Sequence, residues 1–148
     1  MWGEEYEASI VWFWSSSPFG ADRVAMAEKQ FYKSRKRNGN GTEAGTFDDG
    51  PSEITPGILD TLKKYDAKAT FFLIGEEITE EREEIVKREI EEGHSVGVHT
   101  YCHKKEEMYC NKEYFWNDFE KCKTRIEEVI GKPVSLHRFP WGSNNGYV

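Results

Sequence analysis

Long hydrophobic runs are absent from the sequence. The longest aromatic and aliphatic stretch, Ala8 to Trp14, is far shorter than the roughly 20 residues that cross a bilayer. The residues before it are acidic where a secretory signal carries basic residues, and no clear small-residue cleavage site follows it. The sequence therefore predicts no membrane span, and it contains no legible export signal from which a compartment could be assigned.

Acidic residues outnumber basic ones, with 27 Asp and Glu against 20 Lys and Arg, and cysteine is scarce. The net charge of −7 argues against nucleic acid and anionic membrane surfaces as partners, because both select for patches of Lys and Arg. The three cysteines, Cys102, Cys110 and Cys122, form no Cys-x-x-Cys pair, which argues against a structural zinc knuckle. An odd number of cysteines does not suggest a disulfide framework. The hydrophobic content of 37% still supports an ordinary folded core.

The chain divides near residue 45. Residues 1–45 show no sustained periodicity apart from a possible short helix at 22–32, and their structure is left open. Residues 46–148 alternate between strand and helix patterns. After a strand entering Thr46, the predicted elements are a helix at 56–65, a strand at 68–74, a helix at 80–92, a strand at 95–98, a helix at 112–130 and a strand at 134–139. This order predicts an α/β fold with parallel strands.

Three polar motifs follow predicted strands. They are Thr46-Phe47-Asp48-Asp49-Gly50, His99-Thr100-Tyr101-Cys102-His103 and Arg138-Phe139-Pro140-Trp141-Gly142. In barrels of parallel strands, functional groups gather on the loops at the carboxyl ends of the strands. We therefore expect the three motifs to meet in one site, with the residue types of a metal-dependent hydrolase.

The first motif supplies two adjacent carboxylates. Successive residues of an extended segment point to opposite sides, so Asp48 and Asp49 are expected to face different partners, one a metal ion and the other a bound water. The alternative is an ordinary Asp-Gly turn in which an Asp caps the following helix.

The second and third motifs supply imidazoles and a guanidinium. On a helical turn, the spacing of His99 and His103 places both rings on one side, within reach of one zinc ion. The alternative is a pair of structural histidines. Arg138, at the end of a predicted strand, is suited to grip a carboxylate bidentately and keep it ionised. Its alternative is a salt bridge at the rim of the fold.

Three further residues are weaker candidates. His94 follows the helix-ending Gly93, and a hydrogen-bonded structural role is expected for it. His137 points to the opposite side from Arg138, and Cys102 points in a different direction from the two histidines around it. Both are therefore expected to pack rather than to bind a metal.

The three motifs resemble the first three motifs of the polysaccharide deacetylase family, the NodB-like carbohydrate esterases. The similarity covers residues 46–145, because the segments between the motifs also look like that family: Thr55-Pro56-Gly57-Ile58-Leu59, Lys68 to Gly75, and Gly93 to Gly97. Arg138-Phe139-Pro140 with Ser143-Asn144 looks closest to the bacterial branch that includes peptidoglycan deacetylases.

The resemblance implies one divalent metal ion, most often zinc, held by Asp49, His99 and His103. Cobalt or nickel would also suit two imidazoles and a carboxylate. The resemblance further implies that Asp48 is the general base and that Arg138 orients it. A backbone N–H near Trp141 would help to hold the oxyanion.

The chain departs from the family pattern in ways that bear on its fold. The later motifs, including the His that serves as general acid, are absent by Val148, and a barrel of this kind usually needs about 250 residues. Gly41 to Gly45 is poor in strand formers. We therefore expect a partial, distorted (β/α) barrel at 46–148, truncated at its C-terminal side, with a damaged or displaced first strand.

The expected function is metal-dependent removal of N-acetyl groups from amino-sugar polymers, either peptidoglycan or a chitin-like chain. One alternative is an esterase that removes O-acetyl groups from xylan-like chains. Another is a catalytically inactive fragment that binds metal or saccharide. The implied partner is an acetylated polysaccharide or oligosaccharide, and the family usually acts outside the cytoplasm or at the cell envelope.

Overall fold

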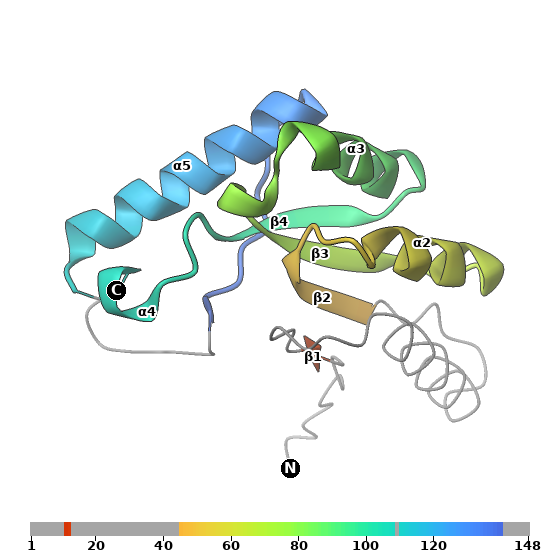
Figure 1. The fold of residues 1–148 in the computed structure, drawn as a ribbon, viewed down its shortest axis with the longest axis horizontal. Helices are drawn as coiled ribbons and strands as arrows, with labels where there is room; N and C mark the ends of the chain where they lie inside the picture. Colours follow the sequence, from red (N-terminus) through yellow and green to blue (C-terminus); the bar gives the residue numbers. More distant parts are fainter. Residues whose placement is uncertain (1–10, 13–44, 109, 141–148) are drawn as a thin grey trace, which may run out of the picture.

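The computed structural model describes residues 11–12, 45–108 and 110–140. Within these ranges, one sheet contains β1 (Val11–Trp12), β2 (Gly45–Gly50), β3 (Ala69–Ile74) and β4 (Ser95–Thr100) in that order (Figure 1). Each strand pairs in parallel with the next. The predicted α/β fold with parallel strands is therefore confirmed. The predicted helix at 22–32 lies outside the described residues.

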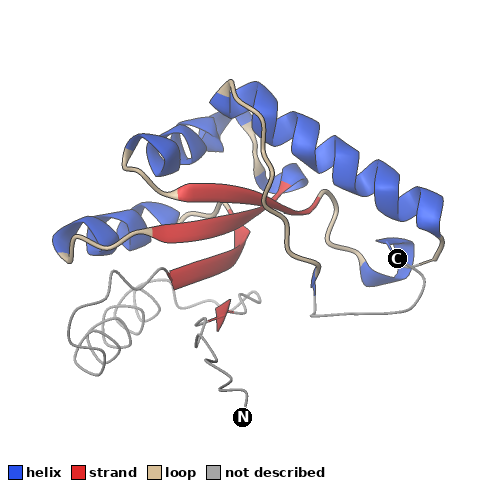
Figure 2. Ribbon diagram, turned by 180° about the vertical axis from the view of Figure 1, so that it is seen from behind, coloured by secondary structure: helices blue, strands red, loops and turns tan. Residues whose placement is uncertain are grey.

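Three helices, α2 (Thr55–Lys64), α3 (Glu83–Glu91) and α5 (Lys112–Ile130), lie on one side of this sheet (Figure 2). The short α4 (Lys105–Met108) lies beyond the carboxyl end of β4, and the described residues also form the 3₁₀ turns η1 (Gly75–Glu77) and η2 (Glu80–Arg82). The three longer helices confirm the predicted ones, whereas the short α4 carries no periodic signal. In the described part of the chain, none of the helices combines the length and apolar character needed to span a bilayer.

One hydrophobic core joins the sheet to α2, α3 and α5. Phe71 of β3 packs in this core with Leu59 of α2, Val86 of α3 and Ile126 of α5. Phe72, on the opposite face of β3, is buried as well. Both faces of this central strand are covered, which explains why its sequence is continuously apolar rather than alternating.

The first motif forms a strand of its own. Residues 45–50 make β2, which pairs with β3 over its length and with β1 at Thr46 and Phe47. The expectation of a damaged or displaced first strand is therefore wrong for residues 45–50. The β-branched Thr46 and the buried Phe47, whose ring stacks on Phe71 at a centroid distance of 5.2 Å, supply the strand character that Gly41 to Gly45 lack.

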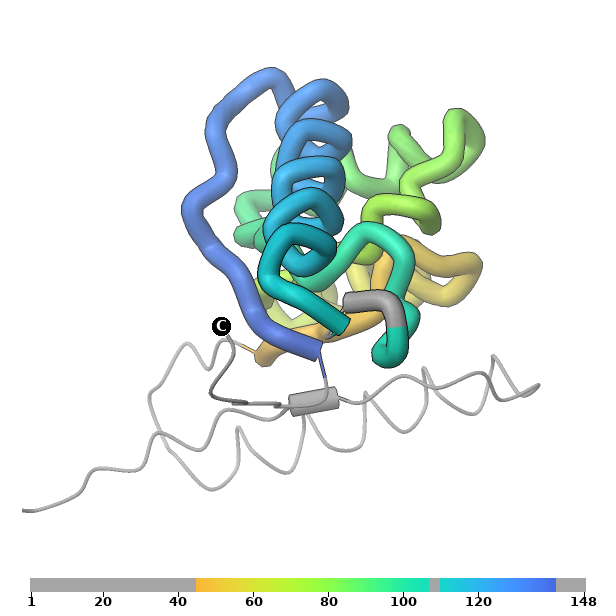
Figure 3. The backbone as a smooth tube through the Cα atoms, turned by 90° about the vertical axis from the view of Figure 1, so that its left-hand side faces the viewer, coloured from red at the N-terminus to blue at the C-terminus, as the bar shows by residue number. Residues whose placement is uncertain are grey.

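The strand predicted at 134–139 is reduced to a single bridge between Val98 and His137. The backbone amide of Val134 donates to Glu127 Oε1 at 2.8 Å, so the chain leaving α5 first bonds to that helix. It then runs back alongside α5 (Figure 3) and reaches β4 only at residues 136–138, which bond to Val98 on both sides. This late contact still delivers the third motif to the carboxyl end of β4.

Candidate active site

Side chains from all three motifs meet at the carboxyl edge of the sheet. Asp49 Oδ1 lies 3.2 Å from His99 Nε2 and 3.2 Å from His103 Nε2. The ligand atoms of these three residues all lie within 4.8 Å of one another. The two imidazole rings are nearly parallel, with centroids 5.5 Å apart. The structure thus brings together the three residues that the resemblance implies as metal ligands.

The end of β2 separates the two carboxylates. The pairing register between β2 and β3 shifts between Asp48 and Gly50, and Asp49 adopts a positive φ of 65°. Asp is among the residues that tolerate this left-handed conformation. As a result, Asp49 faces the histidines while Asp48 faces Arg138, with Asp48 Oδ1 3.0 Å from Arg138 Nη1. The expectation that the two side chains point in different directions is confirmed, whereas a metal ion and a water as their partners stay predictions.

The two histidines do not share a helical turn. His99 lies in β4, and His103 lies in the loop that follows, with a positive φ of 50°. The prediction of a helical turn is wrong, because Thr100 and the loop backbone bond to Asp118 of α5 instead of forming a helix. Asp118 accepts hydrogen bonds from Thr100 Oγ1, at 2.7 Å, and from the amides of Tyr101 and Cys102, at 2.6 and 3.0 Å.

The tautomer of His99 follows from its hydrogen bond. His99 Nδ1 lies 2.9 Å from the backbone carbonyl oxygen of Arg138. A carbonyl oxygen only accepts, so Nδ1 carries the proton, and in the neutral ring Nε2 presents its lone pair to Asp49. A bare nitrogen 3.2 Å from a carboxylate oxygen is not a hydrogen bond, and a cation between the two atoms would satisfy both.

The donor set fits a divalent metal ion. Asp49 Oδ1 is buried, and among the described residues it accepts no hydrogen bond. Burial lowers the pKa of the His103 imidazole, and the Asp49 carboxylate opposes that shift only in part. The neutral form of His103, which metal coordination requires, is therefore favoured. One carboxylate and two imidazoles are ligands that zinc and related ions prefer.

The Arg138 side chain forms a hydrogen-bonded ion pair with Asp48. Its Nη1 donates to Asp48 Oδ1 at 3.0 Å and to Thr46 Oγ1 at 2.9 Å, and its guanidinium carbon lies 4.4 Å from the centre of the Phe72 ring. The described contact to Asp48 uses one nitrogen, not the predicted bidentate pair, and the same nitrogen also donates to Thr46. The Asp48 side chain is only 6% exposed, so this is not a salt bridge at the rim.

Two opposing influences set the proton affinity of Asp48. Burial raises the pKa of its carboxyl group, and the Arg138 guanidinium beside it opposes the rise. The net direction is upward, which makes Asp48 a stronger base than an exposed aspartate.

The weaker candidates lie outside this cluster. His94 is buried and its Nδ1 accepts a hydrogen bond from the Ala69 amide at 3.2 Å, which confirms a structural role. His137 packs edge-on against Phe119 and Phe139. Cys102 is not among the clustered ligand atoms in the described residues. The backbone near Trp141, implied as part of an oxyanion site, lies outside the described residues.

Sequence reasoning missed three residues that shape the site. Thr46 accepts a hydrogen bond from the Arg138 guanidinium, and the Phe72 ring stacks against that group. Asp118 accepts hydrogen bonds from the turn between the two histidines. Thr46 and Phe72 sit in predicted strands and could have been found from pairing register. Asp118 carries no signal, because one acid in a long charged helix resembles its solvated neighbours.

Residues 35–148 match the sequence profile described as polysaccharide deacetylase. A Bacillus cereus peptidoglycan-N-acetylglucosamine deacetylase is 48% identical over 101 residues, which cover 68% of this chain and 36% of that protein. The chain therefore spans about a third of that curated relative.

The chain is also similar to solved structures. The Xyl-CE4 domain of a multidomain xylanase from the hindgut metagenome of Trinervitermes trinervoides matches with a TM-score of 0.66 and 34% identity, covering 70% of this chain and 50% of that one. A family 4 acetyl xylan esterase from Clostridium thermocellum, in complex with a cobalt ion, matches with a TM-score of 0.59 and 26% identity, covering 66% and 50%. The chain thus spans half the length of these structures.

Proposed function

Because the chain belongs to the polysaccharide deacetylase family, we propose that it takes part in metal-dependent hydrolysis of N-acetyl groups on amino-sugar polymers. Peptidoglycan is the proposed polymer, as the name of the Bacillus cereus relative suggests. A peptidoglycan substrate would also place the protein at the cell envelope. The main support for the proposal is that the two adjacent carboxylates contact different groups. Asp48 forms an ion pair with Arg138, whereas Asp49 lies between the imidazoles of His99 and His103.

Asp49, His99 and His103 would hold the metal ion, with zinc as the first candidate and cobalt or nickel as substitutes. A divalent ion in such a site supplies Lewis acidity to an attacking water and to the acetyl carbonyl. The hydrogen bond from His99 Nδ1 to the Arg138 carbonyl keeps the Nε2 lone pair aimed at the ion.

Asp48 would take the proton of the attacking water. Its raised pKa improves its strength as a base, and the Arg138 guanidinium keeps the carboxylate ionised and directed. The stacking of Arg138 on Phe72 and its bond to Thr46 hold the guanidinium in place while the base changes protonation state. These contacts pre-organise the pair before substrate arrives.

Two other functions have support of their own. Removal of O-acetyl groups from xylan would use the same centre, and the two solved structures above come from xylan-degrading proteins by their titles. A metal-binding chain without turnover is the other candidate, because no third histidine of the described residues joins the cluster of Asp49, His99 and His103. The two remaining histidines of the described residues, His94 and His137, contact Ala69 and the rings of Phe119 and Phe139 instead.

The test is acetate release from N-acetylglucosamine oligomers by the 148-residue chain, with and without added zinc. Asp48→Asn keeps the size of the side chain but removes its basicity, and we expect a loss of about 10²- to 10⁴-fold in rate. Glu53→Gln is the matched control, because it removes a carboxylate from an exposed position near the same strand end.

The outcomes separate the candidates. Zinc-dependent release that Asp48→Asn abolishes and Glu53→Gln preserves supports the deacetylase. Release from acetylated xylan alone supports the esterase. No release from either substrate by a folded chain that binds zinc would refute hydrolysis by this chain and leave the inactive binding protein.

A further inference from the structure

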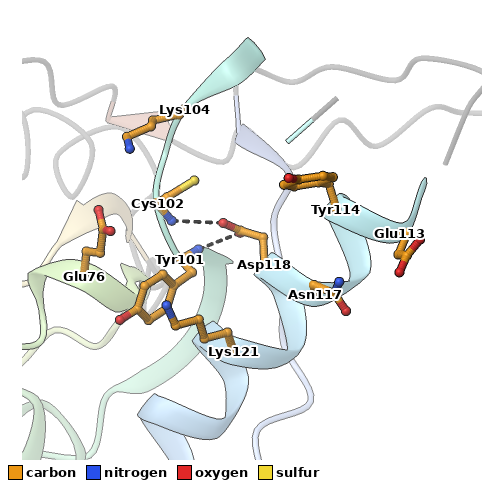
Figure 4. A pocket seen from close by; sticks show the side chains of 9 residues that line it. All are labelled: Glu76, Tyr101, Cys102, Lys104, Glu113, Tyr114, Asn117, Asp118 and Lys121. Carbon is orange, nitrogen blue, oxygen red and sulfur yellow. Dashed lines mark hydrogen bonds between the residues drawn. The ribbon is translucent and has the colours of Figure 1, made fainter. Parts of the chain in front are cut away.

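The turn that links the two histidine ligands is bonded to a neighbouring helix. Asp118, in the middle of α5, points away from its own helix toward the backbone of residues 101–102 (Figure 4). Its Oδ2 accepts from Thr100 Oγ1 at 2.7 Å and from the Tyr101 amide at 2.6 Å, and its Oδ1 accepts from the Cys102 amide at 3.0 Å. One carboxylate therefore binds three consecutive residues between the ligands.

Thr100 extends this contact to the second ligand. A hydroxyl group has one proton, and Thr100 directs that proton to Asp118, so its oxygen is left to accept. It accepts from the His103 backbone amide at 3.2 Å. The path from Asp118 through Thr100 ends on the residue whose Nε2 lies 3.2 Å from Asp49.

Further contacts hold Tyr101 of the same turn. The Tyr101 carbonyl accepts from the Glu76 amide at 3.0 Å, and Lys121 Nζ lies 3.7 Å from the centre of the Tyr101 ring. That ring lies so close to Gly75 that a Cβ there would be 2.4 Å from it. The turn is thus gripped between η1 and α5.

The conformation of His103 needs such support. Its φ of 50° is one that residues with a Cβ adopt rarely, and such residues persist where the surroundings hold them. Asp118 is not an end cap of its own helix, because the Asn111 side chain accepts from the Tyr114 amide there. The Asp118 carboxylate instead acts on the neighbouring turn.

We propose that Asp118 is a positioning residue that fixes the 101–103 turn and thereby sets His103 against Asp49 and His99. This inference rests on the proposed function, because it assumes that these three side chains share a metal ion. Asp118 is not among the clustered ligand residues Asp49, His99 and His103, and it acts through the backbone of the turn and the Thr100 hydroxyl. Its removal should loosen one ligand while the other two stay in place.

Co²⁺ titration of the full chain tests the inference, since Co²⁺ absorption reports both affinity and ligand geometry. In Asp118→Asn, one of the two accepting oxygens becomes an NH₂ group that faces a donor. We expect Co²⁺ affinity to fall about 10- to 100-fold and the absorption bands to change. Glu120→Gln, an equal charge change at an exposed position of α5, should bind within about twofold of the parent.

A second pair of variants covers the case in which Asp118→Asn does not fold, as judged by circular dichroism of the metal-free chain. Thr100→Val leaves Asp118 on both backbone amides and removes only the hydroxyl link to His103, whereas Thr100→Ser retains it. We expect weakened Co²⁺ binding in Thr100→Val and restored binding in Thr100→Ser.

The outcomes are distinct from those of the deacetylase test. Folded Asp118→Asn or Thr100→Val with the affinity and spectrum of the parent would overturn the positioning role. A parent chain that binds no Co²⁺ would overturn it together with the metal part of the proposed function. Tight Co²⁺ binding by the parent without acetate release would refute only hydrolysis. The positioning role would then be judged from the Co²⁺ affinities of the variants.

Discussion

A buried acid on α3 should make the stability of this protein fall as pH rises. Glu89 is 0% exposed, and neither of its carboxylate oxygens accepts a hydrogen bond from the described residues. The adjacent cation, Arg88, bonds to Asp60 and Glu92 instead. Burial raises the pKa of Glu89 well above its usual value, so the folded chain keeps a proton that the unfolded chain releases.

The sign and size follow from proton linkage. Between the unfolded and the folded pKa of Glu89, the folded state binds one more proton, so the free energy of unfolding decreases as pH rises. The slope for one proton is about 1.4 kcal/mol per pH unit. Full stability is present below the unfolded pKa and is lost progressively up to the folded one. Glu89→Gln has nearly the same shape without the titration, so this slope should vanish in the variant.

The assay is urea unfolding at a series of pH values above 4.5, for the parent, Glu89→Gln and Glu91→Gln. Glu91 is an exposed residue of the same helix, so its variant controls for net charge. The difference between Glu89→Gln and the parent should widen in favour of the variant by up to about 1.4 kcal/mol per pH unit. Parallel pH profiles for these two proteins would refute the reasoning, because they would mean that Glu89 finds a partner or water that keeps it ionised.

Three further predictions concern the site. Arg138→Met should shift the acidic limb of the pH–rate profile to higher pH, because losing the guanidinium removes the strongest influence that lowers the pKa of Asp48; an unchanged limb in steady-state rates would contradict this. For a chain incubated with metal at about 100 times its Kd, removing the metal with a chelator should lower the melting temperature by roughly 5–10 °C. An unchanged melting temperature in calorimetry would argue against a bound ion. Gly97→Ala should destabilise the fold by about 1–3 kcal/mol in denaturant titrations, because the new Cβ would lie 2.8 Å from the Phe72 ring and 3.0 Å from Leu136 Cβ; parent-like stability would show that the ring has room to move.

The sequence was sufficient to predict that the three polar motifs would meet in one site. Hydrophobic runs and glycine stops locate β3, β4 and the three longer helices, and parallel strands send their carboxyl ends to one edge. Asp49 and His99 follow directly, since β2 and β4 flank the same strand. The resemblance to a known family implies roles for Asp48 and Arg138 that spacing alone leaves open, and these roles stay predictions.

The local geometry was beyond the reach of the sequence. A spacing of four residues suggests a helical turn at His99 and His103. It does not reveal that the side chain of Asp118, on another helix, accepts hydrogen bonds from the amides of this turn, which then do not form a helix. The same limit applies to Glu89. Periodicity placed Val86 inside, whereas Glu89, three residues later on that face, reads as part of a solvated acidic helix.

Arg138 contacts both Asp48 and His99, and it uses different atoms for the two contacts. Its guanidinium bonds to Asp48, while its backbone carbonyl accepts from His99 Nδ1 and its backbone amide donates to the Val98 carbonyl at 2.9 Å. The side chain therefore contacts the proposed base, and the backbone contacts a proposed metal ligand. Because backbone groups survive substitution, changing this side chain should alter the base and spare metal affinity. The short bridge between residues 136–138 and β4 then holds the proposed base and the proposed metal ligands next to each other, even though it is not a full strand.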